Sequence, residues 1–444
     1  MNIRKALLAA TLLGLFAAYA LATGPAELAK QAVSEDASAS GEAIRELRQS
    51  GPYGLDVLLN QFAGEIAEFT ANGKKTDQWL RIARALDSVS MQKDSYSSGL
   101  YWYTDLDDAK AAAKKQNKPI LSLRLLGNLN EEFSCANSRL FRSVLYPNAE
   151  IRKYLRDNYI LHWLSVRPAP RITIDFGDGR KIERTITGNS IHYVLDENGT
   201  VIEALPGLYS PKGFLIYLTQ AKQVNDRIDG LSPEKRDRAL LGYRKLSFDR
   251  LAAQRSKAVV IAKVDLVEPG PAIITPVAPA ANVKQTGPAF AISAITAAPA
   301  ALTKMAVTDE LSMLRVYDNF ARFEPTIKLD DWNRLARVYS PGASLDAASN
   351  AFIRRQNLST GLIESDFKKL FEKLERYIAL DTTRNDLLFH TKLYEWLNRE
   401  PRVEVEKLND WVYADLFMTP ASDKWLGLYS TDIYTALDGN GIIK

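Results

Sequence analysis

The stretch from residue 99 to residue 223 alternates strand and helix patterns in an order that constrains the fold more than any other feature of the chain. Helical and apolar strand segments alternate first, and then two hairpins and a helix follow. The elements are expected at residues 105–116, 119–126, 138–145, 150–158, 159–166, 172–187, 191–204 and 211–222, with Thr104 as the cap of the first helix. This order, a β-α-β half followed by an antiparallel ββα half, predicts an α/β domain on a mixed sheet.

The first 22 residues have the pattern of an export signal. Arg4 and Lys5 precede an apolar run over residues 6–17, and Ala20-Leu-Ala22 supplies the small residues that a signal peptidase reads. The apolar run is shorter than the roughly 20 residues of a spanning helix, so retention as a membrane anchor is the alternative. The mature chain is expected in the periplasm or outside the cell.

Charge and cysteine content limit the possible functions. The chain has a formal net charge of +4, and the signal segment holds two of its cations and no acidic residue. Such a nearly balanced chain is not expected to bind nucleic acid. Cys135 is the only cysteine, so no internal disulfide can form and stability must come from packing. One cysteine and three scattered histidines predict no metal site, and no other cofactor is expected.

Composition divides the rest of the chain into further parts. Residues 23–42 are small and polar and predict a loose spacer, and helical spacing starts near Ala43. Prolines among alanines predict an extended linker over residues 265–303. Apolar faces at helical spacing then predict a helical C-terminal domain, with breaks at Asp381-Thr-Thr-Arg-Asn385 and Arg399-Glu-Pro401. The predicted order is a signal peptide (1–22), a spacer and helical cap (23–98), the α/β domain (99–223), a helical extension (224–264), the linker (265–303) and a mainly α C-terminal domain (304–444).

The residues around Cys135 follow a known order. Trp102 and an acidic helix start precede Lys118-Pro119 and the first core strand. Ser134-Cys-Ala-Asn-Ser138-Arg comes next, followed by Tyr146-Pro147, and later by Val194–Gly199 and Gly207. This stretch resembles secreted bacterial thioredoxin-like domains, which carry Trp-Cys-x-x-Cys at the position of residues 134–138. The resemblance covers about residues 99–223 and implies a thioredoxin-like central domain with a degenerate C-x-x-S motif.

Three positions depart from that pattern. Ser134 replaces the usual tryptophan, Ser138 replaces the resolving cysteine, and Ser190 lies where the family has a cis-proline. In the family the loop at this proline offers its backbone to the substrate, so Ser190 and Ile191 are the candidate substrate-loop residues that the resemblance implies.

Cys135 and Ser138 are the candidate catalytic residues. A thiol at a helix N-terminus is favoured as the thiolate, and Ser138, one turn later, is expected to donate a hydrogen bond to it. Without a resolving cysteine, attack on a disulfide stops at the mixed disulfide. The accessible chemistry is therefore monothiol exchange or isomerisation. The alternative is structural, because a free cysteine is often a buried apolar residue.

The histidines offer little additional chemistry. His162 and His192 lie on predicted core strands and are expected to be neighbours in the sheet, where His192 is a conceivable partner of Cys135. His390 is expected on a helix surface or in packing. The tryptophans of the C-terminal part are expected to build a core.

Three functions remain open at this point. The favoured one is an exported module that binds a protein or peptide, or acts as a scaffold, in the cell envelope with weak or no redox turnover. The second is a monothiol oxidoreductase or isomerase that holds its partner as a mixed disulfide through Cys135. The third places the function in the C-terminal domain, with the thioredoxin-like unit only positioning it.

Overall fold

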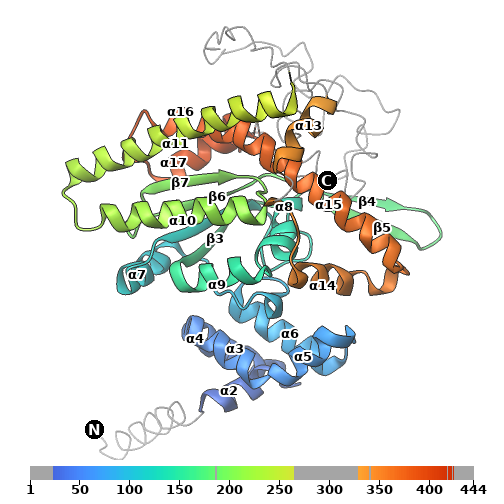
Figure 1. Ribbon diagram of the computed structural model, residues 1–444. Helices are drawn as coiled ribbons and strands as arrows, with labels where there is room; N and C mark the ends of the chain where they lie inside the picture. The colour runs from blue at the N-terminus through green and yellow to red at the C-terminus, as the bar shows by residue number, and fades with distance from the viewer. Residues whose placement is uncertain are drawn as a thin grey trace, which may run out of the picture. The chain divides into compact units, whose positions relative to one another are not determined.

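The computed structural model describes residues 24–185, 188–264, 329–339, 342–417, 419–422 and 424 (Figure 1). The predicted signal peptide at 1–22 and the predicted linker at 265–303 lie outside these residues. The chain forms two compact units, Met1–Trp102 and Tyr103–Lys444. Among the described residues no helix is both long and apolar enough to cross a membrane.

The first unit is a helical bundle with its own core. Its helices are α2 (Pro25–Ala32), α3 (Ala37–Gln49), α4 (Pro52–Gln61), α5 (Ala63–Asn72) and α6 (Asp77–Ser90), followed by the short turn η1 (Ser95–Ser97). Leucines, alanines and Trp79 from these helices form one buried cluster, and the rings of Phe69 and Trp79 stack at 4.0 Å. The helices predicted from Ala43 onward are therefore present.

The loose spacer predicted at residues 23–42 is wrong, because α2 and the start of α3 occupy it. Asp36 caps α3 by accepting hydrogen bonds from the backbone N–H groups of Ser38 and Ala39. Small side chains such as Ala29 and Ala32 let α2 approach the neighbouring helices closely, and both are fully buried. A composition of small residues was thus compatible with packed helices as well as with a spacer.

Gly54 marks a close approach of α4 to α3. A Cβ atom at residue 54 would collide with the backbone carbonyl of Leu47, whereas one at Gly64 of α5 would have open space. We expect Gly54→Ala to destabilise this unit by about 1 to 3 kcal/mol through overpacking. Gly64→Ala is expected to be neutral or stabilising by up to about 1 kcal/mol through helix propensity. Thermal unfolding of both variants checks this, and equal effects would contradict the contact.

A five-stranded mixed sheet organises the second unit, in the order β1-β3-β2-β6-β7. The strands are β1 (Trp102–Tyr103), which spans the boundary of the units, β2 (Ile120–Leu126), β3 (Ile160–Arg167), β6 (Ser190–Leu195) and β7 (Val201–Pro206). β2 pairs in parallel with β3 and antiparallel with β6, and β6 pairs antiparallel with β7. All residues of β2, β6 and β7 are buried, which explains why their sequences are mostly apolar.

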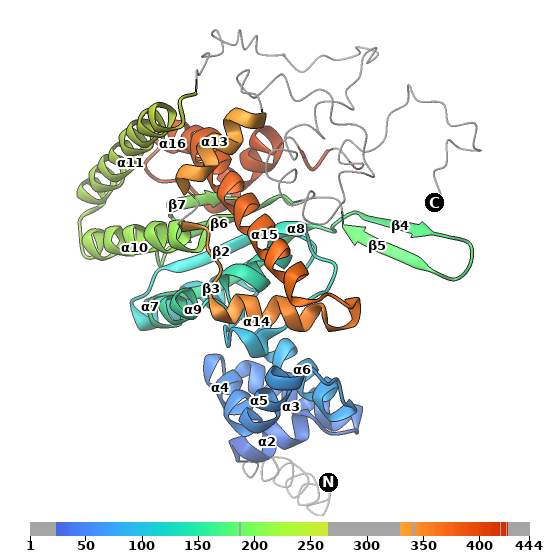
Figure 2. The ribbon, with the colours of Figure 1, turned by 45° about the vertical axis from the view of Figure 1, so that its right-hand side comes forward.

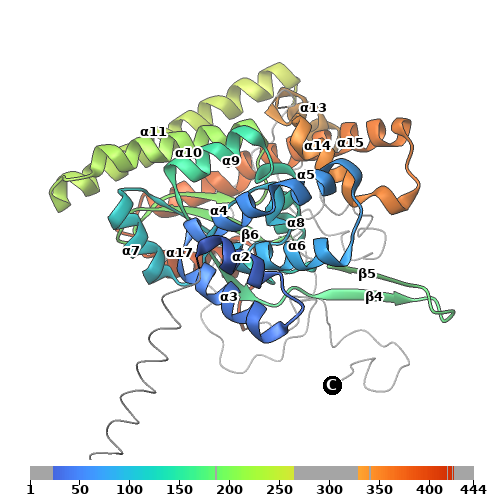
Figure 3. The same ribbon diagram turned by 90° about the horizontal axis from the view of Figure 1, so that it is seen from below.

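Helices connect and cover these strands. They are α7 (Leu106–Gln116), α8 (Ala136–Leu140) with the π-helix η2 (Phe141–Leu145), α9 (Ala149–Asn158), α10 (Pro211–Ile228) and α11 (Pro233–Ala262). The cap of α7 is Asp105, which accepts from the N–H groups of Asp107 and Asp108, and not Thr104 as expected. The predicted hairpin is β4 (Arg171–Asp175) with β5 (Lys181–Thr185), and it extends away from the sheet (Figure 3).

The described C-terminal helices belong to the same compact unit as the sheet. They are α13 (Leu329–Tyr339), α14 (Ala347–Gln356), η6 (Leu358–Thr360), α15 (Glu364–Arg384), the π-helix η7 (Asn385–His390), α16 (Thr391–Leu397), α17 (Val405–Trp411) and the π-helix η8 (Val412–Leu416). Figure 2 shows α15 crossing beside the sheet. The carbonyl of Val403 accepts a hydrogen bond from the backbone N–H of Val201 in β7 at 3.1 Å, so the C-terminal chain reaches the sheet edge directly.

Arg244 of α11 joins three segments at that edge. Its guanidinium is fully buried and donates to the carbonyl of Val201 in β7 at 2.6 Å. It also donates to the carbonyls of Leu397 and Glu400, both at 3.0 Å, where α16 ends. These acceptors are among the carbonyls that a helix terminus leaves unpaired, so Arg244 both caps α16 and ties it to the sheet.

The helix break predicted at residues 381–385 is wrong. Asp381 to Arg384 end α15, and the helical path continues without a break through η7 into α16. Thr382 and Thr383 donate to the carbonyls of Ile378 and Ala379, four residues earlier, at 2.8 and 2.7 Å. Internal hydrogen bonds of this kind let hydroxyl residues stay inside a buried helix. The break predicted at residues 399–401 is confirmed, since α16 ends at Leu397 and α17 starts at Val405.

Candidate functional site

Cys135 is the N-cap residue of α8, directly after the loop that leaves β2. Its side chain is free and has no exposed surface. The backbone N–H of Cys135 donates to the carbonyl of Leu126, the last residue of β2, at 3.0 Å. The structure therefore places the thiol at the end of a central strand, as the sequence pattern indicates, but inside the protein.

Ser138 and Ser134 surround the thiol with hydroxyl groups. The Cys135 thiol donates to Ser138 Oγ at 3.5 Å, and Ser138 Oγ lies 2.7 Å from Ser134 Oγ and 2.8 Å from the Cys135 carbonyl. Ser138 has one hydroxyl proton, and its short contacts direct this proton to oxygen acceptors. In this arrangement the thiol of Cys135 donates to Ser138, and the hydrogen bond predicted from Ser138 to a Cys135 thiolate stays a prediction.

The predicted substrate-loop residues Ser190 and Ile191 open strand β6 and are fully buried. The carbonyl of Ser190 accepts from the N–H of Gly207 at 2.8 Å, and both residues are in register with β2. Their backbone is thus occupied by the sheet. Three buried side-chain oxygens in this region have no hydrogen-bond partner within the described residues: Asn137 Oδ1, Asn189 Oδ1 and Ser190 Oγ.

His162 and His192 are not neighbours, contrary to expectation. His162 pairs with Ser122 and His192 pairs with Leu123, so one strand separates them. Because successive residues of β2 face opposite sides of the sheet, the two imidazoles also lie on opposite faces. His192 Nε2 lies 2.9 Å from the hydroxyl of Tyr146. Burial lowers the pKa of each histidine to about 3, with the Arg124 cation contributing at His162.

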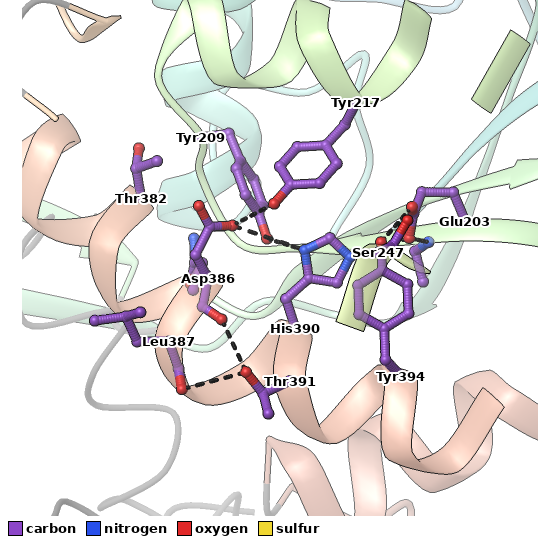
Figure 4. Close-up of polar contacts among 12 residues, drawn as sticks. Glu203, Tyr209, Tyr217, Ser247, Thr382, Asp386, Leu387, His390, Thr391 and Tyr394 are labelled. Carbon is purple, nitrogen blue, oxygen red and sulfur yellow. Dashed lines mark hydrogen bonds and ion pairs between the residues drawn. The ribbon is translucent and has the colours of Figure 1, made fainter. Parts of the chain in front are cut away.

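A second cluster of polar side chains lies between the sheet and the C-terminal helices (Figure 4). We call it the Glu203 cluster. Each residue type in it is ionisable, and the members are drawn from β7, α10, α11, η7, α16 and the loop after β7. They are Glu203, Tyr209, Tyr217, Tyr243, Asp386, His390 and Tyr394. Glu203 and His390 have no exposed surface.

Glu203 uses both carboxylate oxygens. Oε1 accepts from His390 Nε2 at 3.0 Å and from the N–H of Ala204 at 2.9 Å. Oε2 accepts from the hydroxyls of Tyr394 at 2.6 Å and Tyr243 at 2.5 Å. A buried carboxylate is tolerated when its lone pairs are filled in this way.

On its other side, His390 faces Asp386. His390 Nδ1 lies 3.2 Å from the Tyr209 hydroxyl and 3.7 Å from Asp386 Oδ1. The Tyr217 hydroxyl donates to the same Asp386 oxygen at 2.9 Å. Figure 4 shows the imidazole lying between the two carboxylates.

The cluster holds its histidine as a cation. Burial alone would lower the pKa of His390, but Glu203 and Asp386 outweigh it and raise this pKa to about 9. Burial likewise acts to raise the pKa of Glu203, and the pair with His390 and the tyrosine hydroxyls lowers it overall. The result is a buried ion pair, His390 with Glu203, at neutral pH.

The sequence contained a signal for this cluster. Glu203 lies in the apolar strand Val201-Ile-Glu-Ala-Leu-Pro206, and a charged residue in a buried strand needs a partner. Its partners His390 and Tyr394 come 187 and 191 residues later, and Tyr243 comes 40 residues later. His390 was expected only on a surface or in packing. No local pattern connects the two.

A cavity of about 280 Å³ opens above Asp386; we call it the Asp386 cavity. Its wall includes Thr382 and Asp386, Tyr217 and Lys212 of α10, and Arg250 of α11. A larger groove of about 640 Å³ runs along the same face of α10, and we call it the α10 groove. Its lining includes Asn148 and Ile151 near the start of α9, and Leu215, Thr219 and Gln223 of α10.

Comparisons with known proteins found no match: no protein-family model, no curated protein and no solved structure is significantly similar to this chain. In the part of the chain that the structure describes, no group of three or more His, Cys, Asp or Glu side chains is arranged to hold a metal ion. The candidate sites are therefore evaluated from their geometry.

Proposed function

We propose that the chain is an exported thioredoxin-like protein that binds a protein or peptide, or serves as a scaffold, in the cell envelope. The fold assignment is supported by the order of elements: β2, α8 to α9 and a parallel β3 form a β-α-β half, and β6, β7 and α10 form an antiparallel ββα half. The signal-like pattern of residues 1–22 supports export.

The complete burial of Cys135 is the observation that favours binding over redox turnover. Thiol exchange needs an in-line approach of a disulfide to the attacking sulfur, and therefore access. The thiol has no exposed surface and hydrogen bonds to Ser138. A buried cysteine of this kind acts as a small packing residue.

The α10 groove is the surface that supports binding. Its volume of about 640 Å³ lies within the range of ligand sites, which runs from roughly 300 to 1,000 Å³. Its lining combines apolar side chains such as Leu215, uncharged polar ones such as Thr219 and Gln223, and the charged residues Glu150 and Lys212. Such a mixed lining suits a peptide segment, which brings backbone donors and acceptors together with apolar side chains.

Two measurements test the proposal. Wild type and Cys135→Ser should both fail to accelerate the reduction of insulin disulfides by dithiothreitol, because the thiol is not accessible. A photo-crosslinking residue at Gln223 in the α10 groove should give a discrete adduct in envelope extracts, and the same residue at exposed Arg238 of α11 should not. Cys135-dependent turnover, or adducts of equal yield at both positions, would count against this function.

Monothiol exchange remains the second candidate, on one observation. Asn137 Oδ1, Asn189 Oδ1 and Ser190 Oγ are buried near the Cys135 segment without hydrogen-bond partners among the described residues. Unpaired buried acceptors cost free energy. A rearrangement that exposes them to water recovers part of this cost, so opening the Cys135 segment to a substrate requires less free energy. The insulin assay above distinguishes the two candidates.

A further inference from the structure

The Asp386 cavity is lined by charges of both signs; Asp386 pairs with His390 at 3.7 Å but, within the described residues, with neither cation of the lining. Arg250, Lys212 and Asp386 all line it. Among the described residues, neither cation has an ion pair with any carboxylate, and the polar contact of Arg250 is a hydrogen bond to Ser247 Oγ at 3.2 Å. The lining of this space of about 280 Å³ therefore combines two cations with a carboxylate; we call the two cations its positive wall and Asp386 its floor.

The floor of the cavity is held in place. Asp386 accepts from Tyr217 and lies against His390, whose own position is fixed by Glu203. Thr382 accepts a hydrogen bond from the N–H of Ser210 at 2.7 Å, which anchors the start of α10 to α15. Groups that are fixed before binding lose little entropy when a ligand arrives, so they are well suited to recognition.

The positive wall has a second contribution. Lys212 lies in the first turn of α10, an 18-residue helix whose N-cap is Ser210. The start of a helix carries a partial positive charge, which adds to the cations Lys212 and Arg250. A carboxylate is therefore favoured at this wall, and an ammonium group is favoured at Asp386. Ile216 and Val338 add apolar surface for a side chain.

We propose that the Asp386 cavity binds a small zwitterion of the α-amino acid class, with its carboxylate toward Arg250 and Lys212 and its ammonium group toward Asp386. At about 280 Å³ the cavity lies just below the range of ligand sites, which starts at roughly 300 Å³, so it suits a small molecule. This inference goes beyond the proposed function, because it concerns a small molecule and does not involve the thiol. Lys212 lines the α10 groove as well, whereas Arg250 and Asp386 line only the Asp386 cavity.

The test is a thermal-shift screen of the full chain with the common L-amino acids, one at a time. The best of them is then titrated by calorimetry beside its decarboxylated amine and its deaminated acid. We expect both analogues to bind at least about tenfold more weakly, since each loses one charge-assisted contact. No binding of any amino acid at about 10 mM, or equal binding of an analogue, would overturn the proposal.

Variants locate the site. Arg250→Gln is expected to weaken binding by about tenfold or more, and exposed Lys212→Gln by a few-fold. Arg238→Gln, on the same helix but outside the cavity, is the matched control and should bind like wild type. Because Asp386 supports the fold as well, Lys212 and Arg250 carry the test. Unchanged affinity in both of these variants would place the ligand elsewhere and refute the inference.

Discussion

Glu203→Gln is expected to lower the free energy of unfolding of the second unit by about 3 to 5 kcal/mol. The substitution keeps the shape of the side chain and removes its charge, which leaves the His390 cation buried without its main partner. Breaking one half of a buried ion pair costs this much because the remaining charge is uncompensated. Urea unfolding, with amide hydrogen exchange in β6 and β7 as the readout for this unit, measures the change.

The control is the same substitution in an exposed ion pair. Glu364 pairs with Arg354 at 2.7 Å, and its side chain is 80% exposed. Glu364→Gln is therefore expected to leave stability almost unchanged, since water screens the pair. A loss at Glu203 as small as that at Glu364 would mean that the Glu203 cluster does not hold a charged histidine.

The stability of the second unit is expected to peak near pH 6.5 and to fall on both sides. The folded pKa of His390 is raised to about 9, so its stabilisation is complete below about pH 6.5 and is lost as the pH rises toward 9. This loss amounts to about 3 kcal/mol. His162 and His192 have folded pKa values of about 3, so their contribution is present above pH 6.5 and is lost as the pH falls.

Single histidine variants separate the acid side of this stability–pH profile from its alkaline side. His390→Gln should flatten the alkaline side, because the group that releases its proton is gone. His192→Gln should make the acid side shallower and leave the alkaline side unchanged. Unfolding free energies between about pH 5 and pH 9 measure both slopes. A profile that rises steadily across this range in the wild-type protein would contradict the assigned charge states.

The sequence was most informative about local structure between residues 99 and 223. Apolar runs and turn residues predicted β2, β3 and both hairpins, because these patterns act over a few residues. The position of Cys135 at the end of β2 also followed from order along the chain. Its burial did not, because a side chain's exposure depends on what packs over it from distant parts of the sequence.

The errors in prediction have physical causes. The polar run at residues 381–385 suggested a helix break, but these residues are buried, and several bond to the loop after β7, as in the pair Asn385 with the Leu208 carbonyl at 2.7 Å. Likewise, Glu203 finds His390 only after the sheet and C-terminal helices have come together. A chain truncated near residue 266 would lose Asp386 and His390, so the Glu203 cluster makes the C-terminal helices part of this unit.

The most direct test of the central claim is the alkylation rate of Cys135 in the native protein and in denaturant. A structural, buried thiol should react with iodoacetamide more slowly in the native state by a factor on the order of a thousand, because reaction requires opening of the structure. Cys135→Ser combined with Lys245→Cys, which places a thiol on an exposed site of α11, controls for reagent access. A native rate close to that of the denatured protein would contradict the account and favour the monothiol enzyme.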